Sequence, residues 1–284
     1  MTYGHHKRSK SRMTAYLCRL FYLGNNYHGS QWQLGLRTVQ GELISAAAKW
    51  SGEEHSPATI QLSGRTDGGV HSIGQIAMIV SGVPLDINQI NKHLPNDITL
   101  WAYAVAPPGF KPRHSVLMRH YRYYLDTSEM NLDVASMQKA TQHLIGSHDF
   151  ALLSKPDGNR SSRATLLNAC ITGSEDMLTL DTYGTSFLWK LVRKIVSLLI
   201  HVGTGELAPE VVPEILHGQT VIHSGIRPAA PECLVLIEAI TPVRMKRSKL
   251  AVKRVQKQMY TQLGFLAKST RTLSALSEDS LLKQ

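Results

Sequence analysis

The spacing of apolar residues along the first hundred positions predicts alternating strands and helices. One side of a predicted strand carries four alternating apolar residues, Tyr16, Cys18, Leu20 and Tyr22. The other side of that strand is mixed rather than polar. Thr38 can N-cap a helix that continues to about Trp50, because apolar residues at helical spacing follow it. A second helix is expected at 86–92, and further strands at 58–62, 75–80 and 100–106.

The second half of the chain repeats this order of elements without repeating the sequence. Pro107-Pro108-Gly109 interrupts the pattern and marks the expected boundary between the halves. After it we expect helices at 132–145 and 186–202, and strands at 120–126, 164–172, 178–183 and 234–240. The prediction is an α+β fold in four parts: a basic N-terminal tail (1–13), an N-terminal half (14–108), a C-terminal half (109–243) and a basic C-terminal extension (244–284).

Composition and charge narrow the class of partner. A chain of 284 residues, 43% of them hydrophobic, can bury a sufficient core without disulfides. Its net charge of +10 predicts an acidic partner. Because no apolar run reaches about 18 residues, that partner is expected to be nucleic acid rather than a membrane interior.

The cysteines and the N-terminal segment indicate a reducing compartment. Cys18, Cys170 and Cys233 lie far apart without Cys-x-x-Cys spacing, which argues against a disulfide framework and against a thiolate metal site. Residues 1–12 are basic but lack the apolar segment of a secretory signal, so export is not expected. The expected location is the cytoplasm, and no metal site is predicted.

The run Gly64-Arg65-Thr66-Asp67-Gly68-Gly69-Val70-His71 places one carboxylate beside an arginine in a glycine-rich turn between two predicted strands. The two glycines after Asp67 permit positive φ and the close approach of another backbone or a ligand. A carboxylate in such a turn is a candidate catalytic group. The alternative is an Asx-turn, in which Asp67 caps its own backbone and Arg65 is solvated.

This run resembles the Gly-Arg-Thr-Asp-x-Gly-Val-His motif of the tRNA pseudouridine synthase A (TruA) family. The resemblance covers about residues 14–240. Five more stretches look like the family's signatures, in the family's order: Tyr27-His28-Gly29-Ser30-Gln31-Trp32-Gln33, Thr38-Val39-Gln40-Gly41-Glu42-Leu43, Leu94-Pro95-Asn96-Asp97-Ile98, Arg119-His120-Tyr121-Arg122-Tyr123 and Phe187-Leu188-Trp189-Lys190-Leu191-Val192-Arg193.

The resemblance implies a fold, a reaction and a substrate. The fold would be two ferredoxin-like (RRM-like) α+β units sharing a mostly antiparallel sheet with a central active-site cleft, which also suits the predicted order of elements. The reaction would be the isomerisation of uridine to pseudouridine without a metal or organic cofactor. The substrate would be the anticodon stem-loop of tRNA, at positions 38–40 in tRNA numbering, and the enzyme would be a homodimer.

Asp67 is the predicted essential carboxylate. The isomerisation breaks the bond from C1′ to N1 and re-attaches the base through C5, and a carboxylate can assist by attacking the sugar or the base, or by stabilising developing charge. In a dry pocket an ionised aspartate needs a cation. Arg193 is the candidate, because it lies at the edge of the apolar face of the predicted 186–202 helix and matches the family's arginine in this helix. On its wheel position alone, Arg193 would rather extend to solvent.

The resemblance assigns the predicted substrate contacts. Tyr121 matches the family's active-site tyrosine, whose ring can stack on the target base and whose hydroxyl can take part in proton transfer. Arg65 is expected to hold the flipped-out nucleotide, with a structural ion pair as its alternative. Leu234 corresponds to the family's apolar residue in the uracil pocket, although Cys233 stands where the family usually has glycine.

Two other functions remain as alternatives. A catalytically inactive tRNA-binding protein of the same fold would be favoured by the loss of Asp67, Tyr121 or Arg193, and all three are present. A metal-dependent hydrolase using Asp67, His71 and another histidine would lose its activity to a chelator, whereas a synthase would be indifferent.

The C-terminal extension differs in composition from both halves. Between Glu238 and Glu278 there is no acidic residue, while lysine and arginine recur as far as Arg271. Apolar residues at spacings of three and four predict an amphipathic helix: Val252, Val255, Met259, Leu263 and Leu266. The helix is either an additional tRNA-binding arm or an element packed on the body with a solvated charged face. The resemblance does not reach this segment.

Overall fold

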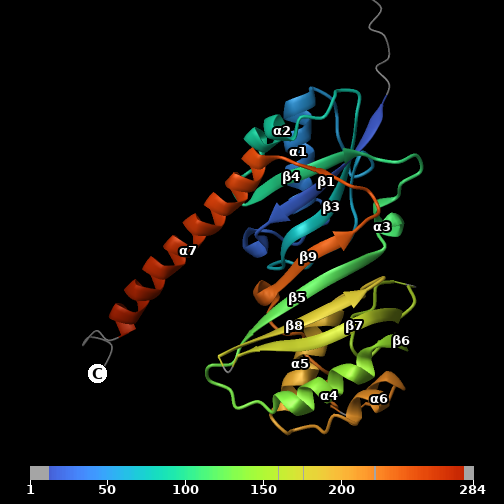
Figure 1. The fold of residues 1–284 in the computed structure, drawn as a ribbon, viewed down its shortest axis with the longest axis vertical. Coiled ribbons are helices and arrows are strands. Elements are labelled where there is room, and N and C mark those ends of the chain that lie inside the picture. The colour runs from blue at the N-terminus through green and yellow to red at the C-terminus, as the bar shows by residue number, and fades with distance from the viewer. Residues whose placement is uncertain (1–12, 159, 175, 221, 278–284) are drawn as a thin grey trace, which may run out of the picture.

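One mixed sheet runs through the computed structural model, which describes residues 13–158, 160–174, 176–220 and 222–277 (Figure 1). Within these residues, ten strands follow the order β10-β4-β1-β3-β9-β5-β8-β7-β6, with β2 paired to β3 beside this path. The strands are β1 (Thr14–Tyr22), β2 (Ile60–Leu62), β3 (His71–Ser81), β4 (Ile98–Val105), β5 (Met118–Asp126), β6 (Gly146–Asp149), β7 (Arg163–Ser174), β8 (Met177–Gly184), β9 (Leu234–Ile240) and β10 (Lys246–Arg247).

The helices complete a mixed α+β fold. They are α1 (Val39–Ser51), α2 (Ile87–His93), α3 (Pro112–Ser115), α4 (Val134–Leu144), α5 (Leu191–Gly203), α6 (Val211–Leu216) and α7 (Lys249–Ser277), with short 3-10 turns η1 (Gly24–Asn26) and η2 (Pro231–Cys233). Among the described strand pairs, β3 and β9 are parallel and the others antiparallel. The predicted α+β class and the mostly antiparallel sheet are therefore confirmed.

The helix starts of the first half follow the capping residues in the sequence. The Thr38 side chain accepts a hydrogen bond from the Gly41 N–H at 3.2 Å, as expected of an N-cap. Asp86 does the same for α2, where its carboxylate accepts from the N–H groups of Asn88 and Gln89. These caps satisfy backbone donors that a helix leaves unpaired at its start.

The mixed pattern of β1 arises because both faces of this strand are buried. Cys18 and Leu20 are fully buried in one apolar cluster with residues of α1, α2 and β4. Leu17, on the opposite face, packs with Ile76 and Met78 in a second cluster. A strand between two apolar layers does not alternate cleanly between apolar and polar residues. The C-terminal half has its own core, in which α4, α5 and α6 cover β5, β7 and β8.

Four parts of the C-terminal half differ from the prediction. The helix expected at 186–202 begins at Leu191, because Lys190 adopts a left-handed conformation with φ of 66° and the residues before it line a pocket. The residues expected to form the start of this helix, 186–190, therefore lie outside α5. α3, β6 and α6 were not predicted, since α3 spans only four residues, β6 is a short polar segment, and α6 spans only six residues and contains Pro213.

The two halves are joined where β9 lies between β3 and β5. In the parallel pair, His71 is opposite Val235. Parallel strands begin at the same edge of a sheet, so the residues that precede β3 lie next to the start of β9. This arrangement brings the turn that carries Asp67 beside Leu234, which is far away along the chain.

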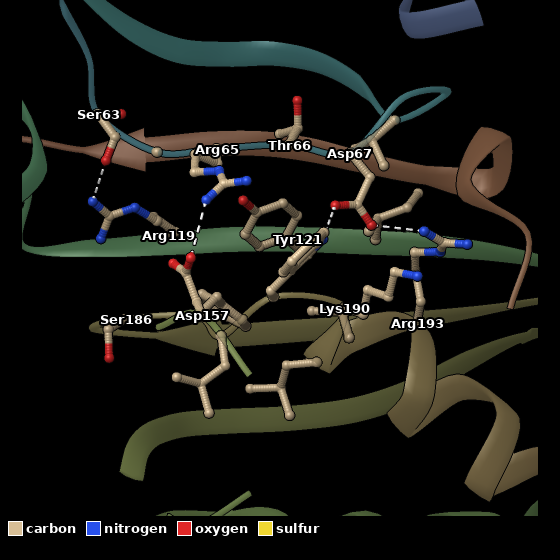
Figure 2. Close-up of a pocket in the computed structure, with 18 of the residues that line it drawn as sticks. Ser63, Arg65, Thr66, Asp67, Arg119, Tyr121, Asp157, Ser186, Lys190 and Arg193 are labelled. Atoms are coloured by element: carbon tan, nitrogen blue, oxygen red, sulfur yellow. Dashed lines mark hydrogen bonds and ion pairs between the residues drawn. The ribbon is translucent and has the colours of Figure 1, made fainter. Parts of the chain in front are cut away.

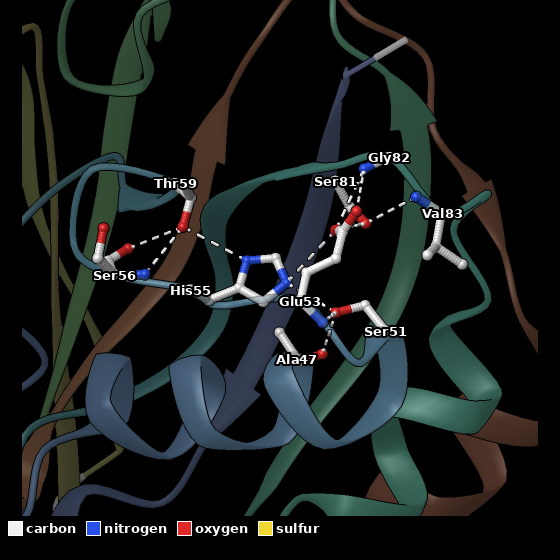
Figure 3. A network of polar contacts seen from close by, with 9 residues as sticks. All are labelled: Ala47, Ser51, Glu53, His55, Ser56, Thr59, Ser81, Gly82 and Val83. Carbon is white, nitrogen blue, oxygen red and sulfur yellow. Dashed lines mark hydrogen bonds and ion pairs between the residues drawn. The ribbon is translucent and has the colours of Figure 1, made fainter. Parts of the chain in front are cut away.

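A polar network fixes the loop between α1 and β2 (Figure 3). The His55 ring lies within 3.0 Å of the Ser51 hydroxyl and 3.3 Å of the Thr59 hydroxyl. Glu53 accepts hydrogen bonds from the Ser81 hydroxyl at 2.6 Å and from the Gly82 N–H at 3.0 Å. The network ties the end of α1 to the end of β3, so it supports the hairpin formed by β2 and β3.

α7 begins on the body and then projects away from it (Figure 1). Arg254 donates hydrogen bonds to the backbone oxygens of Asn91, Leu94 and Pro95, which lie at the end of α2. Farther along the helix the side chains are solvated, and Leu263 is 62% exposed. The first part of α7 is therefore packed on the body, whereas the rest is exposed, and its interpretation as a tRNA-binding arm stays a prediction. No helix within the described ranges has both the length and the hydropathy needed to span a bilayer.

Candidate active site

The turn between β2 and β3 is held by contacts with the segment after β1. The Ser30 hydroxyl accepts from the Thr66 N–H at 2.8 Å, and the Ser30 N–H donates to the Thr66 oxygen at 3.0 Å. Gly69 has φ of 87°, and a Cβ built there would lie 2.8 Å from Pro231. Glycine is required at this position by both the conformation and the close packing. The turn is therefore held in place by residues on both sides of Asp67 in the chain.

The Asp67 carboxylate is bound by two donors from one segment of the C-terminal half (Figure 2). The Arg193 Nη1 atom lies 2.6 Å from Oδ2, and the Trp189 Nε1–H donates to Oδ1 at 2.9 Å. The Arg193 Nε–H also donates to the Ala229 oxygen at 2.6 Å, which fixes the guanidinium. With 12% of the Arg193 side chain and 21% of the Asp67 side chain exposed, the pair is shielded but still open to a ligand. Charge-assisted bonds of this kind stabilise the ionised carboxylate.

A cavity of about 430 Å³ opens beside this ion pair. The volume falls in the range typical of small-molecule sites. Val70, Leu234 and Phe187 supply apolar wall, and Tyr121, Asp67 and Arg193 supply polar atoms. Tyr121 lines the cavity, and Figure 2 shows its ring between Asp67 and Asp157. Such a pocket suits a planar base that has an apolar face and polar edges.

Tyr121 is 6% exposed and packs edge-to-face on Phe187, with ring centroids 4.8 Å apart. Burial raises the pKa of the Tyr121 hydroxyl above its ordinary value, and the nearby Asp67 charge adds to the effect. The hydroxyl therefore keeps its proton at neutral pH and can donate a hydrogen bond. The structure thus brings Asp67, Arg193 and Tyr121 together, as predicted, with Leu234 in the same wall.

Arg65 lies at the rim of the cavity with 43% of its side chain exposed. Its contact with Asp157 is long, at 3.4 Å, and its guanidinium lies 5.3 Å from the centre of the Trp189 ring. An exposed ion pair of this length contributes little to stability. Arg65 can consequently exchange Asp157 for another anion.

Two residues of the site were missed in the sequence. Trp189 contacts Asp67 directly, although the sequence placed it only within the predicted 186–202 helix. Arg119 is buried and donates to the backbone oxygens of Ser63 and Thr185 on opposite sides of the cavity, and burial lowers its pKa. Both residues lie inside stretches that match the family's signatures. The sequence alone could not show which groups they contact.

The ligand set of the hydrolase alternative does not come together in the described part of the chain. No group of three His, Cys, Asp or Glu side chains there has the arrangement of a metal site. The His71 Nδ1 atom accepts a hydrogen bond from the Gly24 N–H at 2.9 Å, so the lone pair of this nitrogen is already used by the backbone. Burial lowers the pKa of His71, which favours the neutral ring that this bond requires.

Comparison with known proteins identifies the family. The sequence model of the tRNA pseudouridine synthases matches residues 140–242. The tRNA pseudouridine synthase A of Methanothermobacter thermautotrophicus is 37% identical over 230 residues, which are 80% of this chain and 82% of the relative. That of Methanococcoides burtonii is 34% identical over 251 residues, 86% and 90% of the two chains.

Among solved structures, a chain of the archaeal box H/ACA sRNP Nop10-Cbf5 complex aligns with a TM-score of 0.38 and 7% identity, over 66% of this chain and 44% of that chain. This chain therefore spans less than half of that one. The curated relatives match over most of their length at more than 30% identity. On this evidence the chain belongs to the tRNA pseudouridine synthase A family, enzymes that isomerise uridine to pseudouridine in tRNA.

Proposed function

We propose that Asp67, Tyr121 and Arg193 catalyse this isomerisation and that Arg65, Tyr121 and Leu234 bind the target nucleotide. The main support for the proposal is the ion pair between Arg193 and Asp67, at 2.6 Å, on the wall of a cavity that Tyr121 also lines. Among the described residues, Asp67 is the one carboxylate of this cavity that accepts hydrogen bonds from both a guanidinium and an indole.

The roles follow from the balance of the reaction. The C1′–N1 bond breaks and a C1′–C5 bond forms, C5 loses its hydrogen and N1 gains one, so the product has the same atoms as the substrate. The ionised Asp67 carboxylate stabilises or attacks the electron-poor centre, and both the acylal route and the glycal route begin from this charge. Tyr121, which is protonated and beside the cavity, is placed to move the proton between base atoms. The apolar walls exclude water that would trap the sugar.

The target base must leave the RNA stack to reach Asp67, because the carboxylate lies inside a cavity. Arg65 at the rim is the residue we assign to the flipped-out nucleotide, through a phosphate or through the gap left in the stack. Its long contact with Asp157 and its exposure support this role. Leu234, only 5% exposed, forms apolar wall against which the base can lie.

We further propose that the substrate is the anticodon stem-loop, at tRNA positions 38–40, and that the enzyme acts as a homodimer in the cytoplasm. The resemblance of the Gly64-to-His71 run and of the other signatures supports this proposal. The experiment is incubation with an unmodified tRNA transcript, followed by mapping of pseudouridine. Modification at 38–40 alone is the expected result, and pseudouridine elsewhere, with these positions unmodified, would contradict it.

Two ferredoxin-like units, 14–108 and 109–243, are proposed for the domain organisation. The order of elements in the first half is β1-α1-β2-β3-α2-β4. In the second half β5, α4, β7, β8, α5 and β9 follow the same order, with α3, β6 and α6 as additions. In each half the fourth strand lies beside the first, and the first beside the third, as in β4-β1-β3-β2 and β9-β5-β8-β7. This is the β-α-β-β-α-β arrangement of ferredoxin-like units.

The projecting part of α7 is proposed as a tRNA-binding arm. Its exposed cations, Lys268 and Arg271, lie on the side of the helix that carries Lys253 and Lys257 nearer the body. This side is roughly opposite to the apolar stripe that begins at Val252. α7 has no acidic residue to offset these charges. A one-sided row of cations on a helix that leaves the body suits a phosphate backbone.

A further inference from the structure

Asp67 is held from two sides by residues that are only four positions apart. The Trp189 N–H donates to one carboxylate oxygen at 2.9 Å, and Arg193 donates to the other at 2.6 Å (Figure 2). An ionised carboxylate offers about four lone-pair sites on its two oxygens. One donor on each oxygen fixes the plane of the group and leaves further lone pairs for reaction. With Arg193 alone, the carboxylate can rotate about its Cβ–Cγ bond.

The backbone before α5 is shaped to place this indole. Lys190 has φ of 66° and ψ of 4°, and it is the one non-glycine residue with positive φ in the described part of the chain. A residue with a Cβ adopts this conformation only against steric repulsion. The left-handed residue separates Trp189 from the first turn of α5, which begins at Leu191. Strain of this kind is retained where the surrounding structure requires it.

Other contacts hold Trp189 in place. The Lys155 N–H donates to the Trp189 backbone oxygen at 2.8 Å. The Lys155 ammonium group lies 4.2 Å from the centre of the indole ring, and the Arg65 guanidinium lies 5.3 Å from it. Cations over an aromatic face are attracted to it, so they restrict the ring without competing for its N–H. The indole N–H is left with Asp67 as its acceptor.

We propose that Trp189 is a positioning residue for the reaction: its N–H fixes the plane of the Asp67 carboxylate, and the left-handed Lys190 places the indole where it can do so. The inference rests on the proposed role of Asp67. It predicts an effect on the chemical step rather than on tRNA binding, because Trp189 acts through Asp67.

The first test is Trp189→Phe, which keeps an aromatic ring and removes the N–H. Single-turnover rates at saturating tRNA should fall about 10- to 100-fold, as expected for the loss of a hydrogen bond to a charged group, and the Kd for tRNA should change less than about twofold. Trp101→Phe is the matched control, since the Trp101 N–H donates to the Ile73 backbone oxygen outside the site. An unchanged rate in Trp189→Phe, or a change in Kd alone, would overturn the proposal.

A pair of variants at Lys190 tests the backbone even if Trp189→Phe fails to fold. Lys190→Gly accepts the left-handed conformation, whereas Lys190→Val resists it. Both lose the ammonium group, so the ratio of their rates reports the backbone alone. We expect Lys190→Gly to be at least about 10-fold faster at saturating tRNA. Equal rates would overturn the role of the left-handed residue. Activity of Asp67→Asn would instead contradict the proposed function itself, so the two failures are distinguishable.

Discussion

Asp67 and Arg193 lie 126 positions apart in the chain, and their side chains meet at 2.6 Å. The contact joins the turn before β3 to the first turn of α5, and therefore one half of the molecule to the other. Because both groups are largely shielded from solvent, removal of either leaves the other buried without its partner. The side chains to which we assign the chemistry thus also join the two halves.

Tyr121→Phe separates stacking from proton transfer. The substitution keeps the ring and its edge-to-face contact with Phe187, so tRNA binding should persist. If the hydroxyl moves a proton, single-turnover rates should fall by about 10²- to 10⁴-fold. Rapid-quench assays at saturating tRNA measure this rate, and normal turnover would leave Tyr121 as a stacking surface only.

His71 should make stability depend on pH. Burial lowers its pKa below the ordinary 6.5, against a smaller opposing effect of Glu232. The unfolded chain then binds more protons than the folded one, so the folded state loses stability as the pH falls below about 6.5 towards the lowered pKa. Above about pH 6.5 the contribution of His71 to the stability of the folded state is fully present.

His71→Asn is the comparison that isolates this effect. Its amide oxygen can accept the Gly24 N–H in place of Nδ1 and does not titrate. Melting temperatures from about pH 8 to about pH 5 should fall less in the variant than in the wild type. Parallel curves for the two proteins would rule out His71 as a source of the pH dependence.

The residues of the candidate site could be selected from the sequence, but their contacts could not be predicted. Asp67 and Tyr121 stand in signatures that match the family, so their types and order sufficed to select them. Arg193 was selected with help from a helical wheel that began too early, since the helix starts at Leu191. Trp189 was missed because its role depends on a single left-handed residue, and lysine carries no signal for that conformation.

At the scale of elements, α7 combines two environments. Its first turns are tied to the body by the three backbone hydrogen bonds of Arg254, and Gln258 still contacts Thr99. Beyond that point apolar side chains are exposed, including Phe265 at 63%. Sequence periodicity predicted the helix correctly, but it could not say where the body ends and the projecting part begins.

Removal of residues 259–284 tests the projecting part. The melting temperature should change little, because the hydrogen bonds of Arg254 remain. Affinity for tRNA should fall, and the plot of log affinity against log salt should flatten by about 0.7 to 0.9 for each phosphate that the truncated protein no longer neutralises. Saturating tRNA should restore most of the turnover.

Lys268→Gln/Arg271→Gln is the matched variant of the full-length protein, since it removes two charges and keeps the helix. It should flatten the salt dependence in the same direction as the truncation. An unchanged salt slope in both proteins would contradict a tRNA-binding arm. A change in sedimentation without a change in slope would assign the exposed apolar stripe to contact with a second copy of the chain.

At the scale of the whole molecule, the active site exists because β9 returns to pair with both β3 and β5. Local patterns predicted β9 with its observed bounds, Leu234–Ile240, and the element order suggested two similar halves. The parallel pairing of β9 with β3 is non-local and has no local signature, so it required the structure. This pairing sets Leu234 beside the Asp67 turn and makes one cavity from two halves.

The central claim is that the Asp67 carboxylate performs the chemistry, and Asp67→Asn tests it most directly. Asp86→Asn is the matched control, because Asp86 caps α2 outside the site and asparagine is an equally good cap. Both purified proteins are incubated with unmodified tRNA transcript, and pseudouridine and tRNA binding are measured. The account predicts that Asp67→Asn binds tRNA and forms no pseudouridine above background, while Asp86→Asn is fully active. Turnover by Asp67→Asn would contradict the account.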